Sequence, residues 1–164
     1  MIAYNVIMDD EIPCQCCCDA LVDFVVLPMG GIGFDSLVLD SFKQMIKHGG
    51  DQWWLYASTC LVCRQNWMIA QDERIYDNYY LRRLSPELMT DVIEFDWWPD
   101  EFLTYEQVLR LGRTTGRFWR FVDPCSPALV TTAEDLRRER PDISVEEIAY
   151  LLGIPASNAA NLLG

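Results

Sequence analysis

Apolar residues in the first half of the chain follow the short period of β-strands, interrupted by one helical pattern. β-Branched and aromatic residues dominate four short runs, which predicts strands at residues 2–8, 20–27, 52–59 and 66–71. Residues 35–48 instead place Leu37, Phe42, Met45 and Ile46 on one helical face and stop at Gly49, so a helix is predicted there. Residues 74–84 fit a strand and a helix equally well.

The next part of the chain carries signals for the start of helices. The sequence Ser-Pro-Glu at residues 85–87 supplies a cap, a proline and an acid for a first turn, which predicts a helix to about residue 93. Residues 104–107 have the spacing of a capping box and predict a second helix. Gly112 and Gly116 are expected to end it.

Pro124 and Pro127 mark a linker, and three more helices are predicted beyond it. They span residues 133–140, 145–152 and 155–163. Ser144 is the expected cap of the middle helix, and Gly153 is expected to turn the chain between the last two. This pair resembles the helix-turn-helix of bacterial regulators.

These patterns together predict an α+β fold in two parts. The first part, over residues 1–123, is expected to be a zinc-knuckle or zinc-ribbon-containing domain, for the reason given below. The second, over residues 128–164, is expected to be a small C-terminal helical bundle. With 51% hydrophobic residues in 164, the chain can bury a real core.

The net charge of the chain limits the classes of partner that it can bind. It has 25 acidic and 13 basic residues, a net charge of −12, and the acids are spread along its length. Such a polyanion repels nucleic acid and anionic membranes, so a basic protein is the expected partner. There is no apolar run of 18 residues and no basic, apolar signal sequence at the start, which predicts a soluble cytoplasmic protein.

Two C-x-x-C pairs predict a metal site. Cys14 and Cys17 form one pair, Cys60 and Cys63 the other, and the second lies between two predicted strands, as in a zinc knuckle. Four thiolates leave no open coordination position, so the expected role is structural zinc, with iron as an alternative metal. Cys16 or Cys18 could replace a ligand of the first pair.

The segment over residues 87–106 is the candidate binding surface, because it contains seven acids, interleaved aromatic residues and no Lys or Arg. The aromatic side chains could anchor a basic partner while the carboxylates steer it. Alternatively, the aromatic residues belong to the core and the acids to its solvated side. The candidate residues are Glu94, Phe95, Asp96, Trp97, Trp98, Asp100, Glu101 and Phe102.

Signals for catalysis are weak. His48 is the only histidine, which excludes a site built from several imidazoles and suggests a cap near a helix end. A reactive cysteine remains the one enzymatic alternative, without local support. The chain is therefore predicted to be an interaction protein and not an enzyme.

The resemblance of one stretch of the chain to a known family predicts a class of function. Residues 53–84 combine tryptophan, C-x-x-C, Gln-x-Trp, Ala-Gln-Asp-Glu-Arg and Leu-Arg-Arg-Leu, and this stretch resembles small bacterial zinc-knuckle immunity proteins. The resemblance implies an acidic, cytoplasmic, non-enzymatic inhibitor of one cognate toxin, such as a nuclease or deaminase delivered by type VI secretion. The alternative is a zinc-containing helix-turn-helix transcriptional regulator or antitoxin that binds DNA. Residues 155–163 contain no Arg or Lys, so its basic contacts would come from Arg137, Arg138 and Arg140.

Overall fold

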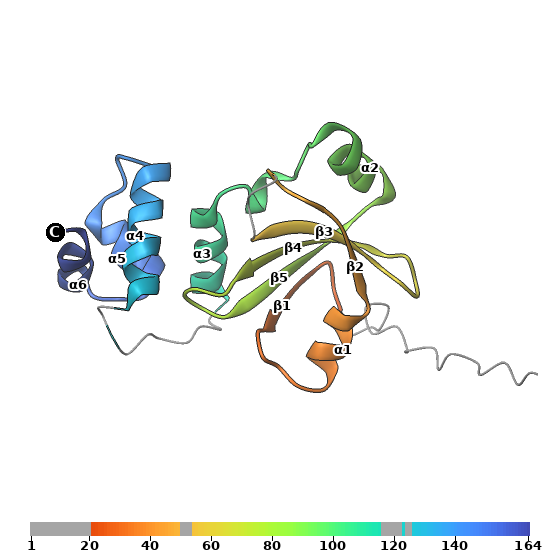
Figure 1. Ribbon diagram of the computed structural model, residues 1–164, viewed down its shortest axis with the longest axis horizontal. Helices are drawn as coiled ribbons and strands as arrows, with labels where there is room; N and C mark the ends of the chain where they lie inside the picture. Colours follow the sequence, from red (N-terminus) through yellow and green to blue (C-terminus); the bar gives the residue numbers. More distant parts are fainter. Residues whose placement is uncertain (1–20, 50–53, 116–122, 124–125) are drawn as a thin grey trace, which may run out of the picture.

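The computed structural model describes residues 21–49, 54–115, 123 and 126–164. These residues form a mixed α and β structure around one antiparallel sheet (Figure 1). The elements in chain order are β1 (Phe24–Pro28), α1 (Phe34–Asp40), β2 (Phe42–Lys47), β3 (Leu55–Cys60), β4 (Asn66–Asp72), β5 (Asn78–Leu84), α2 (Pro86–Phe95), the short 3-10 helix η1 (Asp100–Phe102), α3 (Tyr105–Thr114), α4 (Pro127–Glu139), α5 (Val145–Leu152) and α6 (Ala156–Leu163).

The sheet has the strand order β1-β5-β4-β3-β2, and both of its faces are buried. Successive residues of β4 show this, because Trp67 and Ile69 pack on the side of α1 whereas Met68 packs on the side of α2 and α3. A strand buried on both faces needs apolar residues at consecutive positions. The predicted hairpin around residues 60–63 is confirmed as β3 and β4, and the ambiguous residues 74–84 include β5, an inner strand between β1 and β4. The predicted strand at residues 2–8 lies outside the described residues.

The helix predicted over residues 35–48 is wrong in its second half. The helix α1 ends at Asp40, and residues 42–47 form β2, which pairs with β3. Phe42 and Ile46 are four residues apart, a spacing typical of one face of a helix. In the strand, the irregularity between Gln44 and Ile46 puts them on opposite faces of the sheet, Phe42 with the cluster on the α1 side and Ile46 with the other cluster. The pairing with β3 decides between helix and strand, and nothing within the segment itself could do so.

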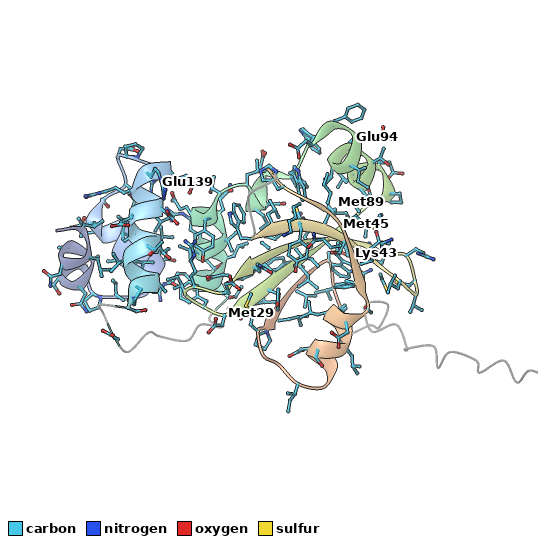
Figure 2. All side chains as sticks on the ribbon, in the orientation of Figure 1. Met29, Lys43, Met45, Met89, Glu94 and Glu139 are labelled. Atoms are coloured by element: carbon cyan, nitrogen blue, oxygen red, sulfur yellow. The ribbon has the colours of Figure 1, made fainter. Side chains whose placement is uncertain are left out.

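Strand β2 is an edge of the sheet, and among the described residues only β3 pairs with it. Its register against β3 shifts between Gln44 and Ile46, where the exposed Met45 bulges out of the ladder. The only two lysines of the chain, Lys43 and Lys47, lie on this strand, and both are exposed. Figure 2 shows Lys43 beside Met45.

Three of the predicted helix starts are confirmed. The side chains of Ser85, Thr104 and Ser144 cap α2, α3 and α5, and the last two helices have complete capping boxes. Helix α4 begins at Pro127, six residues before its predicted start. Gly112 does not end α3 but lies buried within it, because the rings of Tyr76 and Tyr80 occupy the space that a side chain would need. Gly116 lies outside the described residues.

The C-terminal helices pack against α3. The hydroxyl of Tyr76 donates a hydrogen bond to the carbonyl of Leu151 in α5. Around this contact, Glu106 of α3 pairs with Arg110 and Arg140, and Arg140 also pairs with Glu147 of α5. The apolar core continues from the sheet through α3 into α4, α5 and α6. Sheet and bundle therefore share buried surface.

Candidate functional site

The structure divides the four candidate aromatic residues into two pairs. Phe95 and Trp97 are exposed, with 71% and 55% of their surface accessible. Trp98 and Phe102 are buried, at 3% and 1%, so their side chains belong to the core and cannot serve as surface anchors. All four carboxylates among the candidates are exposed: Glu94, Asp96, Asp100 and Glu101. The surface formed by these four acids with Phe95 and Trp97 is called the aromatic-acid surface below.

The end of α2 positions the two exposed aromatic residues. Asp96 adopts a left-handed conformation with φ of 53°, and the amide of Trp97 bonds back to the carbonyl of Asp91 at 3.2 Å. The indole N–H of Trp98 donates to the Asp96 carboxylate at 2.6 Å. One end of the segment is therefore tied to the helix and the other to the core, with Phe95 and Trp97 directed outward.

His48 packs against this turn. It follows β2 in the chain and not the predicted helix, and its ring lies edge-on to Trp98, with 5.1 Å between ring centroids. Its Nδ1 is 3.8 Å from a carboxylate oxygen of Asp96. The expected surface cap is thus a half-buried packing partner of the aromatic-acid surface.

A cavity of about 350 Å³ opens beside Trp97. Asp100 and Glu101 of η1 line it together with Arg82 of β5, and Arg82 Nη1 lies 2.8 Å from Glu101 Oε1. Arg82 was absent from the candidate residues, because the ambiguous pattern of residues 74–84 did not show that this side chain points toward η1. Figure 2 shows Glu94 on α2, well separated from α4 to α6.

The second C-x-x-C pair lies in the turn between β3 and β4. Cys60 is fully buried and Cys63 partly, and both belong to the apolar cluster on the α1 side of the sheet. Arg64 has a φ of 66°, the left-handed conformation that often follows the second cysteine of a knuckle and that glycine adopts most easily. Its amide bonds to the Cys60 carbonyl at 3.1 Å, and the Cys60 amide bonds to the carbonyl of Gln65 at 2.9 Å.

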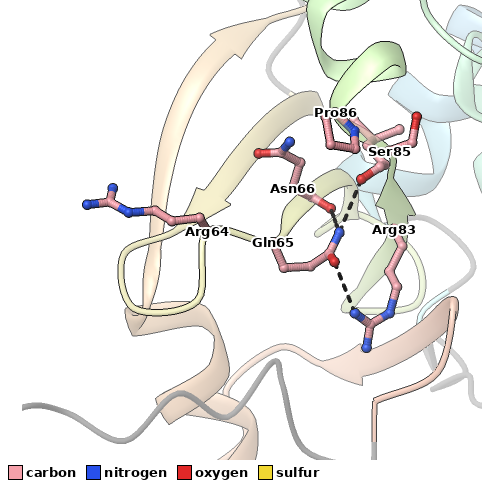
Figure 3. Close-up of a pocket in the computed structure, with 7 residues that line it drawn as sticks. Arg64, Gln65, Asn66, Arg83, Ser85 and Pro86 are labelled. Atoms are coloured by element: carbon pink, nitrogen blue, oxygen red, sulfur yellow. Dashed lines mark hydrogen bonds between the residues drawn. The ribbon is translucent and has the colours of Figure 1, made fainter.

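Gln65 fixes this turn to the sheet, as Figure 3 shows. Its amide nitrogen donates to the carbonyls of Leu84 and Asn66, and its oxygen accepts from Arg83 at 3.2 Å. The side chains of Gln65 and Arg83 line a shallow cavity of about 270 Å³. These polar groups bond to one another, so we interpret the residues around this cavity as the anchor of the cysteine turn.

Cys14 and Cys17 lie outside the described residues, but the chain just after them is placed. Leu21 is buried in the same apolar cluster as Cys60 and Cys63, and its carbonyl accepts from Arg83 at 2.8 Å. Within the described residues, no three potential metal ligands come together. A four-thiolate site would therefore need both pairs, and the placement of Leu21 fits that requirement.

A buried carboxyl group with a raised pKa lies elsewhere, under α3. Asp72 accepts hydrogen bonds from the amides of Arg74, Ile75 and Tyr76 and, at 2.6 Å, from the hydroxyl of Tyr105. Burial raises the pKa of Asp72 above its ordinary value, and these hydrogen bonds oppose the shift. The group holds the turn before β5 against α3, which is a structural task.

The C-terminal helices have the predicted helix-turn-helix shape, with Gly153 left-handed at the turn. Arg137 and Arg138 are exposed, but Arg140 is bound to Glu106 and Glu147, and this pairing lowers the pKa of Glu147. The first turn of α5 also presents Glu146. Such a charge pattern disfavours contact with phosphate.

No family model matches the sequence, and no curated protein or solved structure is significantly similar to it. In the described part of the chain, every helix is too short or too polar to cross a membrane.

Proposed function

We propose that this protein is a cytoplasmic, non-enzymatic immunity protein that binds a basic cognate toxin and blocks its active site. The observation that carries the proposal is the pair of exposed aromatic side chains, Phe95 and Trp97, among four carboxylates. Buried aromatic anchors supply much of the affinity of protein interfaces, and charges around them speed association with a partner of opposite sign. The net charge of −12 gives the whole chain the same preference for a basic partner.

The rigidity of the aromatic-acid surface supports the same conclusion. Trp98 is packed in the core, bonded to Asp96 and in contact with His48, so the neighbouring Trp97 is held in place before a partner arrives. A surface ordered in advance loses less conformational entropy on binding. For a toxin that acts on nucleic acid, such as a nuclease or deaminase delivered by type VI secretion, the carboxylates would take the place of substrate phosphates.

Structural zinc is the second part of the proposal. Cys60 and Cys63 would provide two ligands, and Cys14 and Cys17 the other two, with Cys16 or Cys18 as possible substitutes. The turn at Arg64 and the buried position of Leu21 support it. Four thiolates would saturate zinc, so the metal would stabilise the hairpin and the entering chain and would carry out no reaction.

The test is protection of a bacterial host from the product of the neighbouring gene, since an immunity protein is normally encoded beside its toxin. The wild-type chain should restore growth, and the variant Phe95→Ser/Trp97→Ser should fail to do so. Loss of one or two anchors should raise the dissociation constant by about 30-fold or more, measured with the purified proteins. The control is Ile32→Ser, which removes a 92% exposed apolar side chain from the loop before α1.

Two results would reject the proposal: a neighbouring protein that does not bind, or a double variant that binds and protects as well as the wild type. The helix-turn-helix shape of α5 and α6 favours DNA binding as the second candidate. A gel shift at low salt that is lost in Arg137→Ala/Arg138→Ala would support that candidate instead.

A further inference from the structure

The cavity beside Trp97 has walls of three chemical kinds. Trp97 lines one side of it, and 55% of this residue is exposed. Asp100 and Glu101 bring two carboxylates from η1, and Leu84 and Leu88 add an apolar wall. An aromatic face and carboxylates both attract cations, while apolar walls suit a hydrocarbon stem. The cavity therefore matches a long cationic side chain better than a compact ion.

Arg82 already shows that a guanidinium fits here. Its Nη1 is 2.8 Å from Glu101 Oε1, and both side chains remain over 40% exposed, so this is a surface ion pair that solvent weakens. Asp100 has no basic partner among the residues that the structure describes. The cavity thus has two carboxylates for one cation of its own, and a second cation would balance the charge.

We propose that this cavity receives an arginine side chain of the basic partner protein, which stacks on Trp97 and pairs with Asp100 and Glu101 while Arg82 gives up its contact. Arginine suits the site better than lysine, because its planar group stacks on an aromatic face, pairs with a carboxylate through two parallel bonds and is less strongly hydrated. The inference rests on the proposed function, since it names the group that the aromatic-acid surface recognises.

The direct test uses a small probe on the full chain. N-acetyl-arginine amide should shift the indole N–H signal of Trp97 in a saturable way, and that signal is assigned by its disappearance in Trp97→Phe. N-acetyl-citrulline amide, which has the same shape without the charge, should leave it unchanged. Arg82→Gln should tighten binding of the arginine probe up to about fivefold, the most that a surface ion pair is usually worth.

Asp100→Asn should weaken binding of the probe. Glu146→Gln, which makes the same change in net charge on α5, should have no effect. The melting temperature of each variant confirms that the fold is intact. Equal shifts with arginine and citrulline, or Arg82→Gln binding no more tightly than the wild type, would overturn the inference.

Protection against the toxin separates this inference from the proposed function. If Phe95→Ser/Trp97→Ser abolishes protection while Asp100→Asn/Glu101→Gln leaves affinity for the toxin unchanged, the immunity function stands and the arginine site is refuted. If the double carboxylate variant loses at least tenfold in affinity, the arginine site is supported. Arginine-to-glutamine substitutions in the toxin would then identify the side chain that enters the cavity.

Discussion

The close contact between α3 and two tyrosine rings gives a sharp prediction for Gly112→Ala. A Cβ atom at this position would lie 2.3 Å from Cδ2 of Tyr76 and 2.8 Å from the hydroxyl oxygen of Tyr80. Favourable contacts between carbon atoms lie at about 3.5–4.0 Å, so one of the elements has to move. Both rings are buried, and Tyr76 cannot swing aside without losing its hydrogen bond to Leu151.

The expected cost of Gly112→Ala follows from three contributions. Overpacking in a core costs about 1–3 kcal/mol. Loss of the Tyr76 hydrogen bond adds about 1 kcal/mol. Alanine is about 1 kcal/mol more favourable than glycine within a helix, which offsets that loss. We therefore expect the free energy of unfolding to fall by about 2 kcal/mol, with a melting temperature lower by roughly 4–8 °C.

Urea denaturation followed by tryptophan fluorescence measures this change. Thr114→Ala is the matched control, because it introduces alanine at an exposed position of the same helix, where changes usually stay within about 0.5 kcal/mol. If Gly112→Ala were as stable as the wild type, the tyrosine rings would not pack against α3 as described. The link between sheet and C-terminal helices through Tyr76 would then also be wrong.

Three further predictions concern the cysteine turn and Asp72. Elemental analysis should find one zinc per chain, lost in Cys60→Ser and kept in Cys125→Ser. Arg64→Gly should raise the free energy of unfolding by about 0.5–1 kcal/mol. A left-handed residue with a side chain costs about 1–2 kcal/mol, and removing that cost is partly offset because glycine loses more conformational entropy on folding. For Asp72, whose pKa is raised in the folded state, the stability of the wild type relative to Asp72→Asn should be largest in acid and should decline as the pH rises.

The direction of the pH effect follows from proton binding. Because the folded protein binds the Asp72 proton more tightly than the unfolded chain, the contribution is complete below the unfolded pKa of about 3.8. It is lost as the pH rises through the folded pKa. A stability difference that grew with pH would contradict this account. A metal content unchanged in Cys60→Ser, or an Arg64→Gly variant less stable than the wild type, would refute the account of the turn.

The sequence was sufficient where structure is determined locally. The caps at Ser85, Thr104 and Ser144 act within one helical turn, and the hairpin around Cys60 and Cys63 joins neighbouring strands. Such signals depend on few distant contacts, so pattern and structure agree.

The sequence was insufficient where distant contacts decide. Residues 42–47 fit a helical pattern, but their pairing with β3 makes them a strand. Trp97 and Trp98 are adjacent in the sequence, yet only the fold shows that one is exposed and the other buried. Gly112 resembles a helix end until Tyr76 and Tyr80 are placed beside it.

The edge strand β2 affects whether copies of this protein can pair through their sheets. An open strand edge is a template for pairing with another chain, and a polymer can grow from it. Here the bulge at Met45 interrupts the ladder, and Lys43 and Lys47 would bring like charges together if two such edges met. Mutual repulsion between chains of net charge −12 acts in the same direction. The β2 edge is therefore a poor template for the sheet-to-sheet pairing from which polymers grow.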